Sequence, residues 1–301
     1  MTSPTIAALR SVALNVPDLA KAETFYTDVW KLTVTAREGG AIYLRGTGAD
    51  HHLLSLHQGG DKAQIRHVTF RARSGAALGE IAKTTVAAGG SIARPLAALT
   101  DPAGGTGLTV RDQDGRLIQV VSGDKRHSDA GEQKDHPVRL AHVVLNAHDI
   151  PKSQKFFEDA LGFRLIDRTK IMAFMNCNAD HHSLALGDAD NDALNHIAFV
   201  MPEVESVMRG GGRMKDAGHG IEWGPGRHGP GNNAFNYFID PFGVVIEYTA
   251  DVQQVDDSYK VGMPEDWKWP AGRVDHWGIS APPSARLKEA QRAVFFVPSE
   301  A

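Results

Sequence analysis

Hydrophobic and polar positions follow the same order twice along this chain of 301 residues. The stretch LRSVALNV, which begins at Leu9, alternates as a half-buried strand does, and the apolar residues after it recur at helical spacing. Asp18 stands where a side chain can cap that helix. The stretch LAHVVLNA, which begins at Leu140, repeats the strand, and Asp149 precedes a second helical pattern. The pattern therefore predicts two strand–helix units in equivalent places.

Further segments match in the same register. IRHVTFRA matches LNHIAFVM, and RDQDGRLIQVV matches IDPFGVVIEYT. The stretches ADHHLLSL and ADHHSLAL also match, which places His52 opposite His182. Because the offset between the copies changes little along the chain, we infer a duplication. Within each half, a strand, a helix and three short strands occur twice, separated by Gly and Asn turns.

Each half is therefore expected to contain paired βαβββ units, which places the chain in the α+β class. A mixed sheet of this kind curls into an open half-barrel with helices outside, and its concave face can receive a ligand. We expect a first domain over 1–125, a polar linker over 126–137, a second domain over 138–252 and a tail over 253–301. A short helix beginning at Ser284 is expected in the tail.

Composition narrows the partners and the compartment. The 32 basic and 36 acidic residues give a formal charge of −4 without long runs, so we expect neither nucleic acid nor a membrane surface as a partner. No run of about 18 apolar residues and no secretory signal occurs, which predicts a soluble, cytoplasmic protein. The single cysteine, Cys177, is expected to be a small buried hydrophobic residue. Histidine is abundant, with 14 residues.

Three counterpart positions distinguish the halves. The first half has Ser11, His67 and Gln119, and the second half has His142, His196 and Glu247. Two imidazoles and one carboxylate form the ligand set that suits non-haem Fe(II), with open positions for substrate and oxygen, and Mn(II) accepts the same set. A single strand histidine is more often a core residue. A glutamate facing inward on an apolar strand, however, needs a partner, and a cation supplies one.

The stretch GRHGPGNNAFNYFIDPFGVVIEY, which begins at Gly226, resembles the signature of type I extradiol ring-cleavage dioxygenases of the vicinal oxygen chelate superfamily. His228, Tyr237, the DPFG segment and Glu247 stand at the places of that signature. Asn236 departs from it, and we expect its side chain on the opposite side of the strand from Tyr237. The chain looks closest to catechol 2,3-dioxygenases and 2,3-dihydroxybiphenyl 1,2-dioxygenases. The resemblance implies two tandem vicinal-oxygen-chelate domains, with the metal only in the second.

The resemblance also implies roles for individual residues. It predicts His142, His196 and Glu247 as ligands of Fe(II), with a small aromatic diol and O2 as the reactants. His182 becomes the acid and base of the site, with His181 as the less favoured choice for that role and as a residue at the substrate. His228 and Tyr237 become the partners of the substrate oxygens. Phe174 and Val144 are expected as apolar walls, and core packing is the alternative for Phe174. The resemblance further implies a homo-oligomer. Trp267, Trp269 and Trp277 of the tail are expected to pack on the second half.

Two other classes share this scaffold. Glyoxalases and epimerases of the superfamily use Zn, Ni or Co to move protons, and activity with zinc in the absence of oxygen would favour that class. Binding proteins of the bleomycin-resistance type use the same concave sheet without metal. They predict no stoichiometric iron and no effect of His142→Ala on ligand binding.

Overall fold

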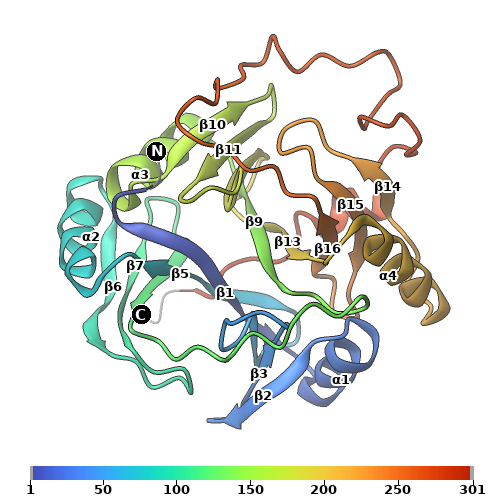
Figure 1. The fold of residues 1–301 in the computed structure, drawn as a ribbon. Helices are drawn as coiled ribbons and strands as arrows, with labels where there is room; N and C mark the ends of the chain where they lie inside the picture. Colours follow the sequence, from blue (N-terminus) through green and yellow to red (C-terminus); the bar gives the residue numbers. More distant parts are fainter. Residues whose placement is uncertain (1–2, 299–301) are drawn as a thin grey trace.

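The computed structural model describes residues 3–298, which form two halves of one design (Figure 1). The first half contains β1 (Ile6–Val16), α1 (Leu19–Thr24) continued by the π-helical turn η1 (Phe25–Val29), β2 (Thr33–Glu38), β3 (Ala41–Arg45), β4 (Leu54–Gln58), β5 (Gln64–Ala72), α2 (Gly75–Ala87), β6 (Ser91–Ala98), β7 (Thr106–Arg111) and β8 (Leu117–Ser122). The second contains β9 (Arg139–Ala147), α3 (Ile150–Leu161), β10 (Arg164–Arg168), β11 (Met172–Asn176), β12 (Leu184–Asp188), β13 (Leu194–Val200), α4 (Val204–Asp216), β14 (Trp223–Arg227), β15 (Ala234–Ile239) and β16 (Val245–Ala250). The tail adds α5 (Ala285–Ala290).

Each half is an open eight-stranded sheet with the same strand order. The first sheet runs β2-β3-β4-β1-β5-β8-β7-β6, and the second runs β10-β11-β12-β9-β13-β16-β15-β14. The paired βαβββ units and the α+β class predicted from the sequence are confirmed. Because the two middle strands of each sheet come from different units, both units contribute side chains to one concave face.

The helices begin at the capping residues predicted from the sequence. The Asp18 side chain accepts a hydrogen bond from the backbone N–H of Lys21 at 2.9 Å, and Asp149 accepts one from Lys152 at 3.0 Å. Such caps satisfy backbone donors that a helix leaves unpaired in its first turn. Ser284 begins α5 in the same way.

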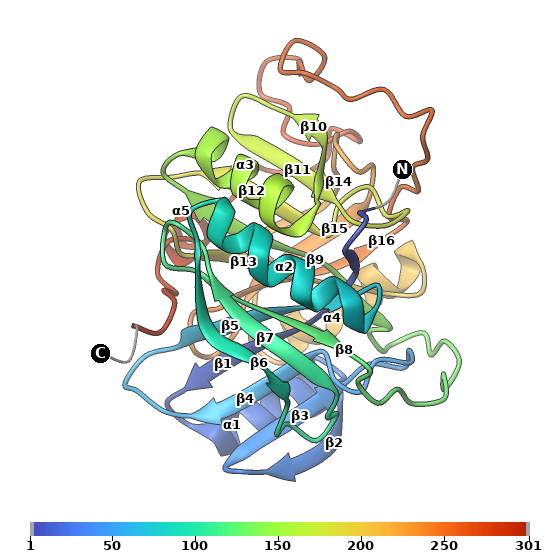
Figure 2. The same ribbon diagram turned by 90° about the vertical axis from the view of Figure 1, so that its left-hand side faces the viewer.

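The halves share one hydrophobic core. The ring of Trp30, at the end of the first-half helical segment, stacks on the ring of Tyr248 in β16 with centroids 3.6 Å apart. The Tyr248 hydroxyl donates to the Trp30 carbonyl at 2.8 Å, and the Tyr26 hydroxyl donates to Asp240 at 2.9 Å. On another side of the molecule, α2 lies beside α3 (Figures 1 and 2). These contacts fix the second sheet against the first.

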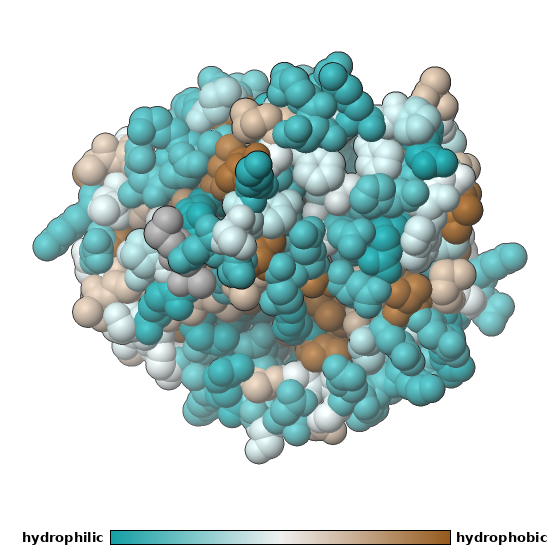
Figure 3. All heavy atoms as spheres, turned by 45° about the horizontal axis from the view of Figure 1, so that its top comes forward, coloured by the Kyte–Doolittle hydropathy of each residue, from teal (hydrophilic) through white to brown (hydrophobic). Residues whose placement is uncertain are grey.

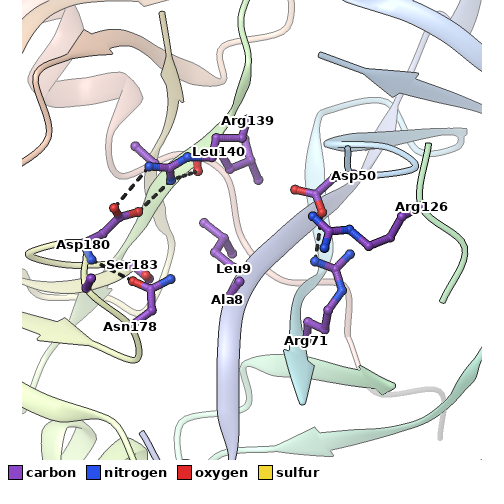
Figure 4. A pocket seen from close by; sticks show the side chains of 12 residues that line it. Ala8, Leu9, Asp50, Arg71, Arg126, Arg139, Leu140, Asn178, Asp180 and Ser183 are labelled. Carbon is purple, nitrogen blue, oxygen red and sulfur yellow. Dashed lines mark hydrogen bonds and ion pairs between the residues drawn. The ribbon is translucent and has the colours of Figure 1, made fainter. Parts of the chain in front are cut away.

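A polar cavity of about 320 Å³ lies where β1 and β9 face each other (Figure 4). On the second-half side, Arg139 donates to Asp180 at 2.7 Å, and on the first-half side Arg71 pairs with Asp50 at 2.9 Å. Both acids belong to the duplicated ADHH stretch. Since each carboxylate is neutralised by an arginine of its own half, these charges stabilise the walls of the cavity.

The tail wraps both halves. Trp267 and Trp269 lie against Gly229, and the Trp277 ring receives the Arg227 guanidinium at 4.9 Å, so these indoles do contact the second half. Beyond α5, the backbone N–H of Leu194 donates to the Val294 carbonyl at 2.8 Å, and Ile65 of β5 exchanges hydrogen bonds with Phe295 and Val297. The segment therefore ends by pairing with the first half.

The surface is mainly hydrophilic on the face seen in Figure 3, where hydrophobic residues form small separate groups. Among the described residues 3–298, no helix is long and apolar enough to cross a membrane. Cys177 is fully buried, and burial raises the pKa of its thiol to about 12, which agrees with the predicted hydrophobic role.

Candidate metal centre and cavity

Three side chains meet on the concave face of the second sheet. His142 lies on β9, His196 on β13 and Glu247 on β16, which are neighbouring strands. In the register, Ala198 is the partner of both His142 and Glu247, so these two side chains point to the same face. The two histidine Nε2 atoms are 3.3 Å apart, and they lie 3.2 Å and 3.3 Å from one Glu247 oxygen. The spacing matches neighbouring ligands on one metal ion, which lie about 3 Å apart when each bond is near 2.1 Å.

The hydrogen bonds around the triad support a cation rather than a protein-only network. The Asn195 amide donates to Asn146 at 2.9 Å, so its oxygen is free to accept from His196 Nδ1 at 2.8 Å. A neutral His196 then directs the Nε2 lone pair at a Glu247 oxygen, which also only accepts. Two acceptors at 3.3 Å repel each other unless a proton or a metal ion lies between them. The donor set therefore fits a divalent cation.

Charge and burial act together on these ligands. Burial alone would raise the pKa of Glu247, but hydrogen bonds with His142, His196 and His228 hold it well below the ordinary value. Burial lowers the pKa of His196 to about 4, against the opposing effect of Glu247. At neutral pH the site is therefore an ionised carboxylate with neutral imidazole, the protonation states that metal binding requires.

His182 lies next to the triad and lines the cavity. Its ring centroid is 4.3 Å from that of His142, and the ring is buried. His181 is placed differently, because its Nε2 points away to Asp167 at 2.7 Å and the residue does not line the cavity. His181 was expected at the substrate, and in the structure it contacts His182, with the two Nδ1 atoms 3.0 Å apart.

His228 and Tyr237 form a pair on the other side of the triad. The Tyr237 hydroxyl lies 3.0 Å from His228 Nε2 and 3.5 Å from His196 Nε2. Burial, together with the charge of Glu247, raises the pKa of Tyr237 well above its ordinary value, so the phenol keeps its proton. The His228 ring is held by stacking on Phe235 with centroids 4.1 Å apart.

The cavity has a volume of about 750 Å³ and largely apolar walls. Val144 and Phe174 line it, and Phe174 packs edge-on against His182 with centroids 5.1 Å apart. Trp223, Trp267 and Trp269 also line it. Two of these indoles come from the tail, so the tail forms part of the cavity wall.

A second group of possible metal ligands differs from the triad. Asp114, His148 and Asp192 lie close together between the halves. Arg116 donates to Asp192 at 2.7 Å and Lys152 to Asp114 at 2.7 Å. The negative charge of this group is therefore already balanced by protein cations, and we interpret it as an ion-pair network.

The sequence profile of the Glyoxalase/Bleomycin resistance protein/Dioxygenase superfamily matches residues 8–120 and 139–248, one match in each half. The chain belongs to this superfamily.

Individual members of the superfamily resemble the chain over nearly its whole length. The chain is 31% identical to metapyrocatechase 2 of Cupriavidus necator, over 90% of this chain and 88% of that protein. The Mn(II)-bound glyoxalase from Novosphingobium aromaticivorans superposes with a TM-score of 0.87 at 32% identity, covering 95% of this chain and 94% of that chain. A variant of homoprotocatechuate 2,3-dioxygenase from B. fuscum superposes with a TM-score of 0.82 at 26% identity, covering 92% and 80%. The resemblance to extradiol dioxygenases seen in the sequence is thus confirmed.

The DPFG segment that begins at Asp240 stabilises the fold. Asp240 accepts hydrogen bonds from the backbone N–H groups of Phe242 and Val244, each at 2.8 Å, and so closes the turn between β15 and β16. Asn236 donates to the Val207 carbonyl of α4, on the convex side, as expected from its alternation with Tyr237. The turn fixes the strand that carries Glu247.

Sequence reasoning missed several polar residues behind the triad. Asn195 orients His196, and the buried Asn233 amide lies 3.4 Å from a Glu247 oxygen and 2.7 Å from the Thr249 hydroxyl. Asn233 stands inside the signature stretch that begins at Gly226, and Asn195 directly precedes a predicted ligand. Their positions beside predicted site residues were the available signal.

Proposed function

We propose that the chain is an extradiol dioxygenase, which inserts both atoms of O2 into a catechol-type ring next to its two hydroxyl groups. The observation that carries the proposal is the convergence of His182, His228 and Tyr237 with a complete metal-binding triad on one cavity. Relatives named metapyrocatechase and homoprotocatechuate 2,3-dioxygenase support it.

His142, His196 and Glu247 would hold one divalent cation through two Nε2 atoms and a carboxylate oxygen. We propose Fe(II), and Mn(II) suits the same donors. When bound, such an ion would supply Lewis acidity, which promotes deprotonation of a hydroxyl group of the diol.

His182 is the proposed proton acceptor and donor. Burial, followed by the neighbouring His142 and His181, lowers its pKa well below the ordinary value, so it enters the reaction as a neutral imidazole. A ring nitrogen on the cavity wall can then take a proton from substrate and return it to a leaving or opening group.

Tyr237 and His228 are the proposed partners of the substrate oxygens. The phenol keeps its proton because its pKa is raised, so it can donate to a substrate oxygen that carries negative charge. His228 Nε2, 3.0 Å away, can exchange a hydrogen bond with the phenol and orient it. The pair thereby stabilises one face of an anionic diol.

The walls indicate the kind of diol. Phe174, Trp223, Trp267 and Trp269 give the cavity largely apolar walls, and its volume of about 750 Å³ leaves room beyond one ring. We therefore propose an aromatic diol with an apolar substituent as the substrate. Apolar walls also strengthen the electrostatic contacts at the triad, because they exclude water.

A glyoxalase-type isomerisation is the second candidate. The similarity to the Mn(II)-bound glyoxalase from Novosphingobium aromaticivorans favours it. Such a reaction consumes no oxygen, so turnover of a substrate under strictly anaerobic conditions would support it over ring cleavage. A metal-free binding role is not favoured by a triad whose acceptor atoms face one another.

The test is anaerobic loading with Fe(II), followed by measurement of oxygen uptake and yellow ring-fission product across a panel of catechols. We expect one O2 consumed for each ring opened, and a parallel Mn(II)-loaded sample decides between the two ions. His196→Ala should abolish both signals, whereas His67→Ala, at the counterpart position in the first half, should retain them. Failure of the fully metallated protein to turn over any diol would overturn the proposal.

A homo-oligomer and a cytoplasmic location remain predictions from the sequence. Light scattering on the purified protein tests the first. Cell fractionation with an antibody to the chain tests the second.

A further inference from the structure

A line of buried polar groups extends behind His182, away from the cavity. His182 Nδ1 lies 3.0 Å from His181 Nδ1, and His181 Nε2 lies 2.7 Å from an oxygen of Asp167. The Tyr259 hydroxyl donates to the same oxygen at 3.0 Å, and the Gly262 backbone N–H donates to the other oxygen at 2.6 Å. Asp167 and His181 are both fully buried.

The chemistry of these groups fixes the direction of each hydrogen bond. A carboxylate only accepts, so His181 Nε2 must carry a proton and donate it to Asp167. In a neutral His181, Nδ1 is then a lone pair. Because it faces His182 Nδ1 at 3.0 Å, His182 must be the donor there. The remaining nitrogen of His182, Nε2, is left as a bare lone pair, and the described residues offer it no hydrogen-bond donor.

We propose that Asp167 is a positioning residue that acts through His181 to hold His182 in the Nδ1–H tautomer, with Nε2 ready to accept a proton in the cavity. The proposal deepens the role given to His182 above, and in that sense rests on the proposed function. The tautomer itself, however, is a property of the protein without metal or substrate.

The first half provides an independent comparison. His51 and His52 keep the same contact, with their Nδ1 atoms 3.0 Å apart. Here His52 Nε2 lies 2.5 Å from the Arg10 guanidinium, which can only donate. His52 is therefore also forced into the Nδ1–H tautomer, but from the cavity side.

The two halves differ in which group fixes the tautomer. Ala141 occupies the place of Arg10 in the second half, which frees the cavity side of His182. Asp167 pairs with Phe174 across β10 and β11 as Ala36 pairs with Tyr43 across β2 and β3, so the acid has no counterpart in the first half. The acid thus occurs only where the outer nitrogen of the histidine must be left free.

The tail secures Asp167. Gly262 approaches so closely that an added Cβ would lie 2.6 Å from the Asp167 oxygen, and the Gly262 carbonyl accepts from the Arg168 N–H at 2.8 Å. This contact also determines what Asp167→Asn would do. The Gly262 N–H requires an oxygen opposite it, so the new amide must turn its NH2 toward His181 Nε2. Every hydrogen bond along the line would then reverse, and His182 would become the Nε2–H tautomer.

Nitrogen NMR of ¹⁵N-histidine-labelled, metal-free protein tests this, because protonated and bare ring nitrogens have distinct shifts. We assign His182 by the signals lost in His182→Gln. We expect Nδ1–H in the wild type and Nε2–H in Asp167→Asn, whereas His51→Gln, in the equivalent first-half pair, should leave His182 unchanged. An Nε2–H His182 or a doubly protonated His181 in the wild type would overturn the proposal, even if Asp167→Asn fails to fold.

Turnover of the Fe(II)-loaded enzyme is the second readout. Asp167→Asn should lower kcat by at least about 100-fold, the usual contribution of a positioned acid or base, with metal content and KM little changed. His51→Gln should keep wild-type kcat. An equal loss of metal and activity in Asp167→Asn would contradict the positioning role. If no diol is turned over but the tautomers are as expected, the proposed function fails and this inference stands.

Discussion

Arg10 occupies in the first half the position that Ala141 occupies in the second, and its guanidinium contacts His52 Nε2 at 2.5 Å. Arg10 is 1% exposed, and its guanidinium group, which pairs with Asp124 at 3.4 Å and Asp101 at 3.7 Å, lies next to the first-half counterpart of the metal triad. A cation repels a metal ion from the same space. The first half therefore lacks this triad because Ser11 and Gln119 stand at two of its positions, and we expect Arg10 to oppose the binding of a metal ion there as well.

Rebuilding the first-half site tests this explanation. Ser11→His with Gln119→Glu would complete a triad with His67, but we expect the protein to keep one metal ion per chain while Arg10 is present. Addition of Arg10→Ala should allow a second ion to bind. Metal content by mass spectrometry measures the ratio. A second ion in the double variant that retains Arg10 would show that its charge is not the obstacle.

The effect of Asn195, which orients the predicted ligand His196, should be measurable without changing any ligand. Asn195→Ala removes the acceptor at His196 Nδ1 and should weaken metal binding by about 10- to 100-fold, as is usual for residues that orient a ligand. Competition with a fluorescent chelator gives the affinity. His67→Ala, which changes the counterpart histidine, is the control and should leave it unaltered. Equal affinity of Asn195→Ala and wild type would contradict the orienting role.

Tyr237→Phe separates hydrogen bonding from packing, because the ring remains and the hydroxyl is lost. We expect kcat to fall by about 100-fold or more while bound metal is retained, since the phenol is proposed to stabilise charge on the substrate. Tyr43→Phe, in the first half, should change neither. Unchanged kcat in Tyr237→Phe would remove the phenol from the mechanism.

Much of this could be predicted from the sequence because of the duplication. Comparison of the copies singled out His142 and Glu247, whose counterparts are Ser11 and Gln119, together with His196, and the sheet registers place the three side chains together. The paired units and the helix caps followed from local patterns. These patterns are local or are repeated within the chain, so they can be recognised without knowledge of the fold.

The remaining part of the site depends on contacts between distant segments. In the sequence, Asp167 is one polar residue in a short strand. Its role depends on contacts with His181 and with Gly262 of the tail, which only the folded structure shows. His181 itself was expected at the substrate, because the sequence alone does not determine which of two adjacent histidines faces the cavity. Trp267 and Trp269 were expected to pack on the second half, but their place in the cavity wall does not follow from the sequence, since the tail has no periodic pattern and no copy in the first half.

Acid should destabilise the protein through its buried neutral histidines. Burial, followed by Arg10 and His51, lowers the pKa of His52 well below its ordinary value near 6.5. Below about pH 6.5, His52 therefore binds a proton in the unfolded chain but stays neutral in the folded chain. The stability contributed by neutral His52 is fully present above about pH 6.5 and is lost as pH falls below it. The loss for one such group is up to about 1.4 kcal/mol per pH unit.

Urea unfolding of metal-free protein from pH 7.5 down to pH 5 measures this loss. The free energy of unfolding should fall less steeply in His52→Gln, which has no proton to bind, than in the wild type. Parallel curves for the two proteins would contradict the assignment. Metal is omitted because its own binding to the triad depends on pH.

Substrate size should respond to the wall at Phe174. Phe174→Ala removes the ring that packs on His182 and lengthens the cavity. We expect kcat/KM to rise for diols with bulky substituents relative to unsubstituted catechol, and the ratio of the two values is the measurement. Leu96→Ala, an exposed residue of β6, should leave the ratio unchanged. An unchanged ratio in Phe174→Ala would indicate that Phe174 only packs in the core.

The closing segment of the chain hydrogen-bonds Leu194 of one repeat through Val294 and Ile65 of the other through Phe295 and Val297. The two repeats are thus joined by a closing segment that is part of neither repeat. Chimaeras that exchange the second half between relatives with a boundary at residue 252 would separate the cavity from the closing segment. Exchange of 138–298 as one block would keep the two together. Suitable breakpoints for recombination in this fold are therefore determined by the closing segment that joins the two repeats, and not by the boundary between the repeats.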